Sequence, residues 1–539
     1  MAIRMTGLVS GLDTDSIVQE LVSAYATKKD DSVKAQTKLS WKQDAWKALN
    51  TKIYSLYKKI GDFRYDSAYN MKKTTVSDST KATITAGSNA IIGTQSLQIL
   101  STAKSEYLTG GELKRGDNSE ITGKTTLGQL GYSDGANTIS VETKDGTKEI
   151  KVDGSTTLEE LVKQFNDAGV TANLDTKNGR LFVSAKNSGT ENAFKLGGSD
   201  SVLKALGLTE DSGANRVEAE DAEIILNGAT FKSSTNQFNV NGLTINVTGV
   251  TGDRPEDALT ITTETDVSGL YDKIKDFLSD YNDLINEMTS LYNADTAKGY
   301  EPLTSDEKDA MSESEIEKWE AKIKDSLLRR DTTLSTVMSG MTNAMASAVY
   351  MKDGVSINYN SITKTYQYNG EDIVDSSGKT ITTSAQMKIY ANANGFKAYN
   401  LSSFGIATLG YLNAEKNEYN AYHIYGDEDD TSTSGKADQL MAMLQSDPDT
   451  VVGFMKGLAN NLYNAIDGQM KSTSLSSAYV VYNDKQMAIE YSDYTSTIKK
   501  WDKKLEEMEE YYYKKFSAME TALSKLQNQT SSLTGLLGG

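Results

Sequence analysis

The chain holds few of the side chains on which catalysis commonly depends. It has a single histidine, His423, and no cysteine. A serine triad needs a histidine as its base, so His423, in the segment NAYHIYGDEDD, would have to supply it. The absence of cysteine excludes disulfides, thiolate nucleophiles and thiolate-bound zinc together. We therefore interpret His423 as part of a tyrosine-rich surface segment.

Two other segments approach known binding motifs and fail on their spacing. The acidic run Asp427 to Asp430 could attract a cation, but it lacks the alternating oxygen ligands and the terminal glutamate of a calcium loop. The segment ITGKTT, which begins at Ile121, is similar to the end of a phosphate loop, yet the required first glycine falls on Asn118. No pair of carboxylates stands out for glycoside hydrolysis. We therefore expect a protein that is not an enzyme and that has no catalytic residue, cofactor or metal site.

Length and charge indicate the number of domains and the kinds of partner that the protein can have. A chain of 539 residues exceeds what one hydrophobic core usually serves, so we expect three or four domains. The formal net charge of -18 disfavours a surface that reads phosphates, and we expect no nucleic-acid partner. No run of about 18 apolar residues occurs, and the first residues lack the pattern of a secretory signal. We expect no membrane insertion and no cleaved signal peptide.

The elements that would have to position any site are helical at both ends. Asp13 to Ser16 offer helix N-caps, and Ser16 and Gln19 have the spacing of a capping box. Two apolar stripes then follow with spacings of three and four residues, which predicts coiled-coil helices. The first stripe comprises Trp46, Leu49, Ile53, Leu56, Ile60 and Phe63. The second comprises Ile498, Trp501, Leu505, Met508, Tyr512, Phe516, Met519, Leu523 and Leu526, with one four-residue stutter.

Between the ends, strands come first and helices return. Short β-branched runs such as TKATITA, TISVET, RLFVSA, AEIILNG and LTINVTG predict strands between residues 73 and 267, interrupted by the helix TLEELVKQFNDAG. Helical spacing resumes at LYDKIKDFLSDYNDLINEM and in two later segments, SEIEKWEAKIKDSLLRRDTTLSTVMSGMTNAM and KADQLMAMLQSDPDTVVGFMKGLANNLYNAI. A strand-rich insert separates those two segments. Both tips of the chain are rich in glycine and serine, so we expect Leu526 to Gly539 and the first 20 or so residues to become ordered only on docking.

These patterns predict an α+β multidomain fold with discontinuous, nested domains, because neither terminal stripe can bury its apolar side chains alone. We expect a terminal α-helical coiled-coil bundle, a helical core domain and outer antiparallel β-rich domains. The predicted ranges are 1–45 with 490–539 for the terminal helices, 46–75 with 265–489 for the helical domain and its insert at about 348–433, 76–120 with 213–264 for a β-rich domain, and 121–212 for the outermost α+β domain.

Several segments, in order along the chain, resemble one protein family. GLVSGLDTDSIVQELV, followed by WKQDAWKALNTKI, is similar to the N-terminal signature of the flagellar filament cap proteins, also called hook-associated protein 2. AEIILNGATFKSSTNQFNVNGLTINV, YNDLINEM, LLRRDTTLS, FGIATLGY, SDPDTVVGFM and the C-terminal FSAMETALSKLQNQTSSLTGLLGG continue the resemblance. Two regions, about Glu112 to Arg216 and Ala348 to Thr433, share no motif with it.

The resemblance implies a structural role. Such a protein would pass through the flagellar type III export apparatus, with an export chaperone as a partner, and would lie outside the cell at the filament tip. There it would form a homo-oligomer, which could be a pentamer, and would retain exported flagellin and help it fold and polymerise. The resemblance implies that Leu8, Ile17, Leu21 and Leu533, together with the two stripes, make the helix-bundle and filament contacts.

Two alternatives stay open at this stage. Another axial protein, such as a filament junction protein or flagellin, would also bury its termini in a helical bundle, although the segment Gly7 to Val22 favours the cap. An adhesin that binds host surfaces through the outer strand domains is a different class of function, namely cell adhesion. Adhesion of this kind is compatible with a role as a filament cap.

Overall fold

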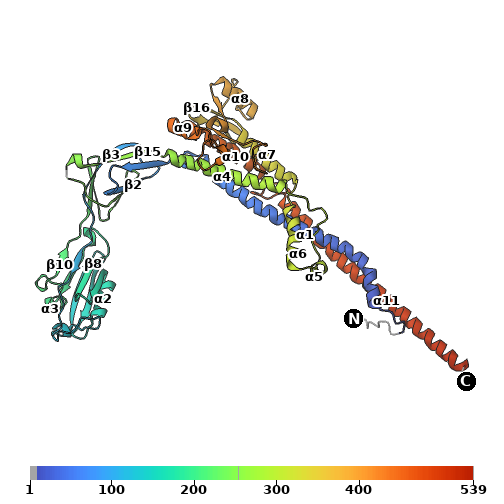
Figure 1. Ribbon diagram of the computed structural model, residues 1–539, viewed down its shortest axis with the longest axis horizontal. Helices are drawn as coiled ribbons and strands as arrows, with labels where there is room; N and C mark the ends of the chain where they lie inside the picture. The colour runs from blue at the N-terminus through green and yellow to red at the C-terminus, as the bar shows by residue number, and fades with distance from the viewer. Residues whose placement is uncertain (1–8, 253, 538–539) are drawn as a thin grey trace. The chain divides into compact units, whose positions relative to one another are not determined.

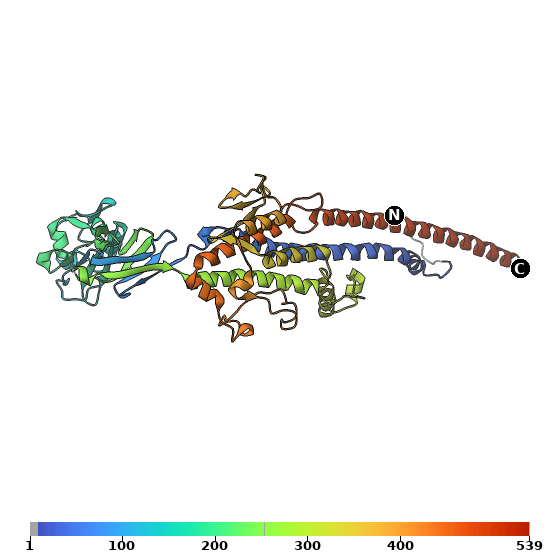
Figure 2. The same cartoon turned by 90° about the horizontal axis from the view of Figure 1, so that it is seen from above.

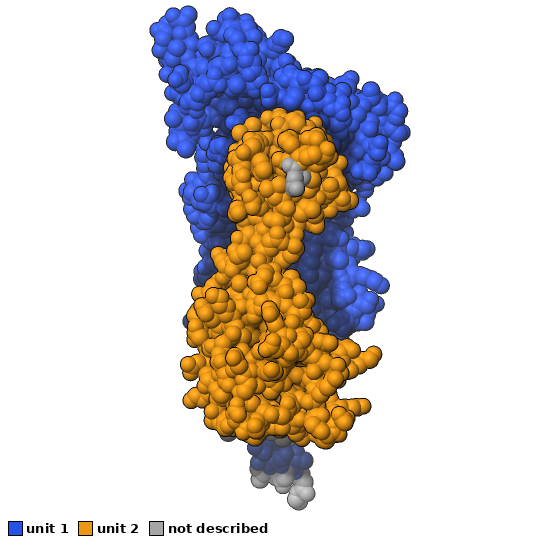
Figure 3. Space-filling view, turned by 90° about the vertical axis from the view of Figure 1, so that its left-hand side faces the viewer, with its two compact units in different colours: residues 1–69, 267–539 blue, residues 70–266 orange. Residues whose placement is uncertain are grey.

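The computed structural model describes residues 9–252 and 254–537. The chain forms two compact units, which Figure 3 colours separately. Unit 1 comprises residues 1–69 and 267–539, and unit 2 comprises residues 70–266. Unit 2 is thus inserted in the sequence between two parts of unit 1, as a nested architecture requires. The finer division into four domains stays a prediction.

Unit 1 is mainly helical. Its helices are α1 (Thr14–Phe63), α4 (Val267–Tyr292), α5 (Ser305–Asp309), α6 (Glu313–Asp325), α7 (Thr332–Ala346), α9 (Gln439–Ser446), α10 (Pro448–Gln469) and α11 (Asp484–Leu537). Within the described ranges, every helix is too short or too polar to span a lipid bilayer.

Helix α1 begins one turn earlier than a Ser16–Gln19 box would place it. Asp13 is the N-cap, and its carboxylate accepts hydrogen bonds from the backbone N–H of Ser16 at 3.1 Å and from the Ser16 hydroxyl at 2.6 Å. The predicted box at Ser16 and Gln19 was therefore wrong. An ionised aspartate is the stronger acceptor at the positive end of a helix, which explains why it takes the cap position.

The C-terminal half of α1 lies inside the helical core. Its first stripe, from Trp46 to Phe63, is at most 5% exposed and packs among α4 and α10. Aromatic pairs fix this packing, with ring centroids 5.3 Å apart for Phe63 and Phe277 and 4.5 Å apart for Tyr57 and Tyr463. This stripe is thus a core seam of unit 1.

The N-terminal half of α1 runs antiparallel to α11. Figures 1 and 2 show the two helices side by side, with α11 continuing past the start of α1. We expected the last residues, from Leu526 onward, to be unordered in the isolated subunit, but α11 continues to Leu537. That expectation was wrong because residues 526–534 contain neither glycine nor proline, so nothing in this segment breaks the helix.

The insert of unit 1 contains short strands and one helix that the sequence pattern did not reveal. Its elements are β16 (Val349–Lys352), β17 (Val355–Ser356), β18 (Asn358–Asn360), β19 (Thr365–Tyr368), β20 (Glu371–Asp372), α8 (Ser384–Ala393), β21 (Lys397–Tyr399), β22 (Ile406–Ala407) and β23 (His423–Ile424). Helix α8 starts at a capping box formed by Thr383 and Gln386. A small core of its own, including Ile381, Met387 and Phe396, holds part of the insert together.

Unit 2 contains two separate hydrophobic cores. The first lies between a five-stranded sheet, in the order β1-β15-β3-β11-β12, and a three-stranded sheet, in the order β13-β14-β2. These strands are β1 (Lys72–Val76), β2 (Ala82–Ala86), β3 (Gly93–Ser101), β11 (Ala222–Leu226), β12 (Ala229–Ser233), β13 (Gln237–Val240), β14 (Leu243–Val247) and β15 (Leu259–Thr265). The alternating burial of β11 and β14 reflects the period-two pattern that predicted them.

The second core of unit 2 is α+β. Two sheets, in the orders β10-β4-β8-β7 and β6-β5-β9, enclose it together with α2 and α3. The elements are β4 (Tyr107–Thr109), β5 (Asn137–Thr143), β6 (Gly146–Val152), α2 (Leu158–Asp167), β7 (Val170–Asp175), β8 (Arg180–Ala185), β9 (Lys195–Gly198), α3 (Asp200–Ala205) and β10 (Asn215–Val217). The five strands and the helix that the sequence predicted are all present, and the antiparallel α+β fold class is confirmed.

Candidate functional site

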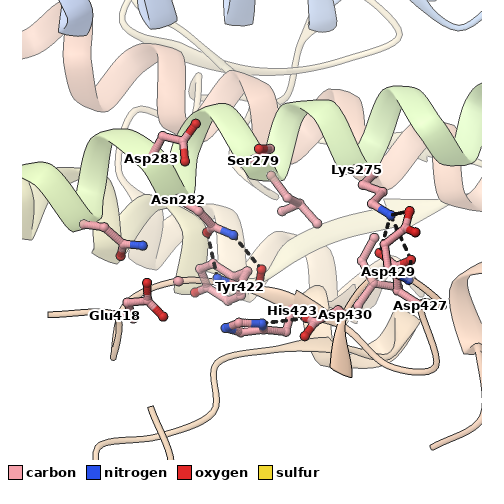
Figure 4. Close-up of a pocket in the computed structure, with 14 residues that line it drawn as sticks. Lys275, Ser279, Asn282, Asp283, Glu418, Tyr422, His423, Asp427, Asp429 and Asp430 are labelled. Carbon is pink, nitrogen blue, oxygen red and sulfur yellow. Dashed lines mark hydrogen bonds and ion pairs between the residues drawn. The ribbon is translucent and has the colours of Figure 1, made fainter. Parts of the chain in front are cut away.

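The single histidine lies in a hollow of unit 1 between α4 and the end of the insert (Figure 4). The hollow has a volume of about 280 Å³. His423 Nδ1 is 2.7 Å from a carboxylate oxygen of Asp430 and 3.2 Å from the Ser432 hydroxyl. Burial disfavours ionisation of Asp430, but hydrogen bonds from Ser432 and His423 outweigh it and lower the pKa of this carboxyl.

Two carboxylates of the acidic run beside this histidine pair with a lysine of α4. Lys275 Nζ lies 2.8 Å from Asp427 and 2.6 Å from Asp429. Burial lowers the pKa of Lys275, but the two carboxylates outweigh that effect and raise it. Among the described residues, no group of three or more His, Asp or Glu side chains is arranged to hold a metal ion. This hollow joins the insert to α4 through the ion pairs of Lys275. Asp430 and Ser432 both lie at Nδ1 of His423, whereas a triad needs the carboxylate and the serine on opposite nitrogens of the ring.

The paired terminal helices form the second candidate site. Figures 1 and 2 show the pair along its length. Successive polar contacts define an antiparallel register: Tyr513 donates to Asp15 at 2.9 Å, Lys29 pairs with Asp502 at 2.7 Å, and Gln36 donates to the Thr495 hydroxyl at 2.6 Å. At the end of the pair next to the helical core, the rings of Trp46 and Tyr482 stack with centroids 5.3 Å apart.

At the other end of the pair, the carboxylate of Glu520 on α11 binds the segment that precedes α1. Glu520 is only 2% exposed and accepts hydrogen bonds from the backbone N–H groups of Val9 at 2.9 Å and Ser10 at 3.2 Å. The Ser10 hydroxyl also donates to Glu520. The hydrogen bond from the Ser10 hydroxyl is the main cause that lowers the pKa of Glu520. Burial opposes this effect, and the backbone N–H groups of Val9 and Ser10 add to it. The charge of Glu520 thus fastens the segment before α1 to α11.

The structure brings only some of the predicted contact residues together. Half-buried side chains on the terminal pair are Ile17, Ile498, Trp501, Leu505, Met508, Tyr512, Phe516 and Met519. Exposed side chains are Leu21 at 41%, Leu523 at 36%, Leu526 at 62% and Leu533 at 58%. Trp46, Leu49, Ile53, Leu56, Ile60 and Phe63 lie in the helical core, away from the second stripe. Leu8 lies outside the described residues.

Sequence reasoning missed three contributors to the terminal pair. The first is Val18, which is fully buried. The second is Glu520, which accepts from the Val9 N–H, and the third is the hydrogen bond from Tyr513 to Asp15. A signal existed for Val18, because the apolar residues Leu21 and Val22 follow it by three and four positions, which is the spacing of one helix face. For Glu520 no local signal exists, since its partners precede it by 510 and 511 residues.

The terminal pair can act as an interface. A helix that pairs with one neighbour covers one side of its apolar stripe, so Trp501, Leu505 and Phe516 remain half-buried and Leu526 stays exposed. Apolar stripes that a single chain leaves partly covered are typical of surfaces that pack against further helices. Fold and site together define the class as a structural protein that assembles with other chains.

Comparison with protein families names that class. The family model described as flagellar hook-associated protein 2 C-terminus matches residues 219–528, which is more than half of the chain, and the model for the N-terminus of the same protein matches residues 10–106. The chain therefore belongs to the flagellar hook-associated protein 2 family. This family is structural rather than catalytic.

Three curated relatives carry the same description. The chain is 27% identical over 370 residues to flagellar hook-associated protein 2 of Halalkalibacterium halodurans, covering 63% of this chain and 68% of the relative. It is 26% identical over 311 residues to the A-type protein of Pseudomonas aeruginosa, covering 53% and 63% of the two chains. It is 23% identical over 454 residues to the Thermotoga maritima protein, covering 80% and 61%. The chain thus spans about two thirds of the length of these relatives.

Solved structures with similarity to this chain include two flagellar cap proteins. The D1-D2-D3 domains of the protein from Escherichia coli align with 18% identity and a TM-score of 0.46, covering 79% of this chain and 96% of that one. The protein from Pseudomonas aeruginosa aligns with 22% identity and a TM-score of 0.30, covering 38% and 93%.

Proposed function

We propose that this protein oligomerises as a cap at the distal tip of the bacterial flagellar filament. There it prevents the loss of exported flagellin and promotes flagellin folding and polymerisation. Membership of the hook-associated protein 2 family supports a flagellar role. The observation that carries the proposal is the terminal helix pair, whose apolar stripe is left half covered by the chain itself.

The stripe has the right chemistry for docking that can be reversed. Covering a half-buried Leu, Met or Phe adds a fraction of the roughly 1.5–3 kcal/mol that full burial of such a side chain contributes. Several such contacts give a specific but limited affinity once the loss of motional freedom is subtracted. A cap must release and re-dock as each flagellin subunit is added, and limited affinity at the helix pair permits that.

The partners follow from this role. We propose flagellin and the filament tip as docking partners and further copies of this chain as oligomer partners, with a pentamer as the assembly to test. We further propose export without a cleaved signal peptide, through the flagellar type III export apparatus and with an export chaperone. A chain without cysteine and with 3 prolines suits that route, because it cannot form disulfide crosslinks and has few X–Pro bonds whose slow isomerisation could delay refolding outside the cell.

The test is complementation of a strain that lacks its own cap protein. The full chain is expected to restore filament growth and motility, and electron microscopy of the purified protein is expected to show a closed oligomer. The matched variants are Leu505→Asp, which places a charge in the half-buried stripe, and Ser496→Asp, which adds the same charge at an exposed position of α11. The proposal fails if the full chain restores no filaments in a strain that exports it, or if both variants behave alike.

A further inference from the structure

The sheet β10-β4-β8-β7 of unit 2 has an outer face that the proposed assembly role does not use (Figure 1). Successive side chains of a strand point to opposite faces of a sheet, and Leu108, Ala172 and Val183 point into the second hydrophobic core. Their neighbours on the same strands therefore point outward. Strand pairing places these side chains in two adjacent rows, which are Val217, Tyr107, Ser184 and Thr171 in the first and Asn215, Thr109, Phe182 and Asn173 in the second. We call this surface the outer sheet face.

The outer sheet face carries no ionised side chain. Every residue of its two rows is uncharged, whereas 24% of the residues in the chain are charged. Lysine, arginine, aspartate and glutamate are ordinarily exposed on protein surfaces. Two rows without charge offer no ion pair to an ionic ligand, so the ligand that fits them is neutral.

Two exposed aromatic rings occupy the centre of this face. Tyr107 on β4 is 53% exposed, and Phe182 on β8 is 38% exposed. Tyr107 is paired with Ser184, two residues from Phe182, so the two aromatic residues are diagonal neighbours at roughly 7–8 Å. Aromatic side chains reach each other at that separation and form one apolar platform. Val217, which is 46% exposed, extends the platform onto β10.

Polar side chains flank the platform on both outer strands of the sheet. Asn215 on β10 and Asn173 on β7 are exposed, and each amide carries donor and acceptor groups. Thr109, Thr171 and Ser184 add hydroxyl groups to the same face. The face is therefore apolar at its centre and able to form hydrogen bonds at its margins.

The size of the face favours a small ligand over a second protein. Adjacent strands lie about 4.8 Å apart, so the face extends roughly 14 Å from β10 to β7 and about 7 Å between its rows. Its area is on the order of 100–300 Å², whereas a stable protein interface buries roughly 800 Å² on each partner. An area of this size suits one or two sugar rings.

We propose that the outer sheet face binds a neutral glycan of one or two pyranose units with equatorial hydroxyl groups. Such a ring has an apolar C–H face and hydroxyl groups that radiate from its edge. The C–H face lies against the rings of Tyr107 and Phe182, and the hydroxyl groups bond the amides of Asn173 and Asn215. The central rings and marginal amides thus match both parts of the ligand.

The experiment titrates the full chain with cellobiose and follows the heat of binding and saturation-transfer NMR. Saturable binding on the order of millimolar is expected, because a small sugar makes few contacts. The double variant Tyr107→Thr/Phe182→Thr removes both rings but keeps side chains that favour strands, and is expected to abolish detectable binding. The second variant, Asn173→Ala/Asn215→Ala, removes the marginal amides and is expected to weaken binding about tenfold.

The matched control is Tyr411→Thr. It removes a tyrosine that is 81% exposed in the insert of unit 1, and it is expected to bind cellobiose as the parent chain does. Sorbitol, a neutral polyol without a ring, and D-glucuronate are the comparison ligands, and both are expected to bind more weakly than cellobiose. Thermal melts and light scattering check that each variant keeps its fold and oligomer size, and the asparagine variant decides the test if the aromatic variant melts early.

The proposal is overturned if cellobiose does not bind saturably or if the control loses as much affinity as the aromatic variant. It is also overturned if sorbitol or glucuronate binds as tightly as cellobiose. A change in oligomer size on removal of the two rings, with cellobiose binding retained, would instead assign the outer sheet face to contacts between copies of the chain.

Discussion

The carboxylate of Glu520 links the described start of the chain to its last helix, and this contact depends on pH. Its hydrogen bonds with Ser10 and Val9 lower its pKa below the ordinary value of 4.5. A group whose pKa is lowered on folding contributes stability above its ordinary pKa, and loses that contribution as the pH falls through the folded value. We expect the amides of Val9 and Ser10 to be protected from hydrogen exchange at pH 7 and to lose protection below about pH 4.5.

Two substitutions separate the charge of Glu520 from its hydrogen bonds. Glu520→Ala removes both and is expected to raise amide exchange of Val9 and Ser10 at every pH, once intrinsic rates are corrected. Glu520→Gln keeps an acceptor and is expected to remove the pH dependence between 3 and 7. Glu510→Ala is the control, because Glu510 is exposed and, among the described residues, its carboxylate pairs with Lys514 at 3.5 Å. Equal effects at Glu510 would contradict the role of Glu520.

Ile53 and Leu21 are both aliphatic residues of α1, and their burial predicts different costs of truncation. Ile53 is fully buried in the helical core, whereas Leu21 is 41% exposed. Ile53→Ala is expected to lower the free energy of unfolding of unit 1 by about 2–5 kcal/mol, because it removes buried methyl groups and leaves a cavity. Leu21→Ala is expected to cost less than about 1 kcal/mol. Urea unfolding followed by tryptophan fluorescence measures both, and equal costs would place Ile53 outside the core.

Sequence spacing revealed which residues of the terminal helices are apolar, but not what covers them. The stripe from Trp46 to Phe63 has the same three-and-four spacing as the stripe from Ile498 to Leu526, so both predict a coiled coil. The first is in fact buried by α4 and α10, which come from residues more than 200 positions away. Spacing along one helix carries no information about such distant partners.

At the scale of elements, the last part of α11 is separable from the rest of the fold. After Glu520, the helix carries the exposed side chains of Leu523, Leu526 and Leu533. We expect a chain that ends at Thr521 to keep the thermal melt and the oligomer size of the full chain, and to lose filament docking. Melting, light scattering and filament growth in cap-deficient cells measure these three properties. Normal filament growth by the shortened chain would show that this segment is dispensable.

The elements that sequence could predict are those with a strong local period. β8, β11 and β14 alternate, and α2 has a capping box at Thr157 and Glu160, so each was visible in the sequence. Helix α8 escaped detection because its segment, SAQMKIYANA, buries only Met387 and Ala391 and so has almost no apolar period. The break between α6 and α7 was also not predicted. It depends on Arg330 at a φ of 55°, a conformation that is uncommon for residues other than glycine and is not evident from the sequence.

At the scale of the whole molecule, unit 2 should fold without unit 1. Its first and last strands, β1 and β15, pair from Lys72 with Thr265 to Val76 with Ile261, so the two ends of the segment lie together. It also has two hydrophobic cores of its own. We expect the fragment 70–266 to be soluble and to melt cooperatively, as circular dichroism can measure. A fragment 90–266, which lacks β1 and β2, is the control and is expected to be unfolded. An unfolded 70–266 fragment would contradict the division into units.

The nested order of the units was the part of the architecture that sequence predicted, because helical stripes at both ends need each other. The confirmed α+β fold class and the family both follow from patterns read in order along the chain. The register of the terminal pair and the hollow beside His423 could not be predicted, since each depends on contacts between residues far apart in sequence.

The antiparallel pairing of α1 with α11 determines when the surface made by both helices can form. Val9 and Glu520 are separated by 511 residues, so their contact closes a loop that contains nearly the entire polypeptide. The docking surface made by both helices therefore cannot exist while a chain is still being synthesised or is threading a narrow conduit. It appears only when the last helix has emerged. We therefore expect a chain that lacks α11 not to associate through this surface.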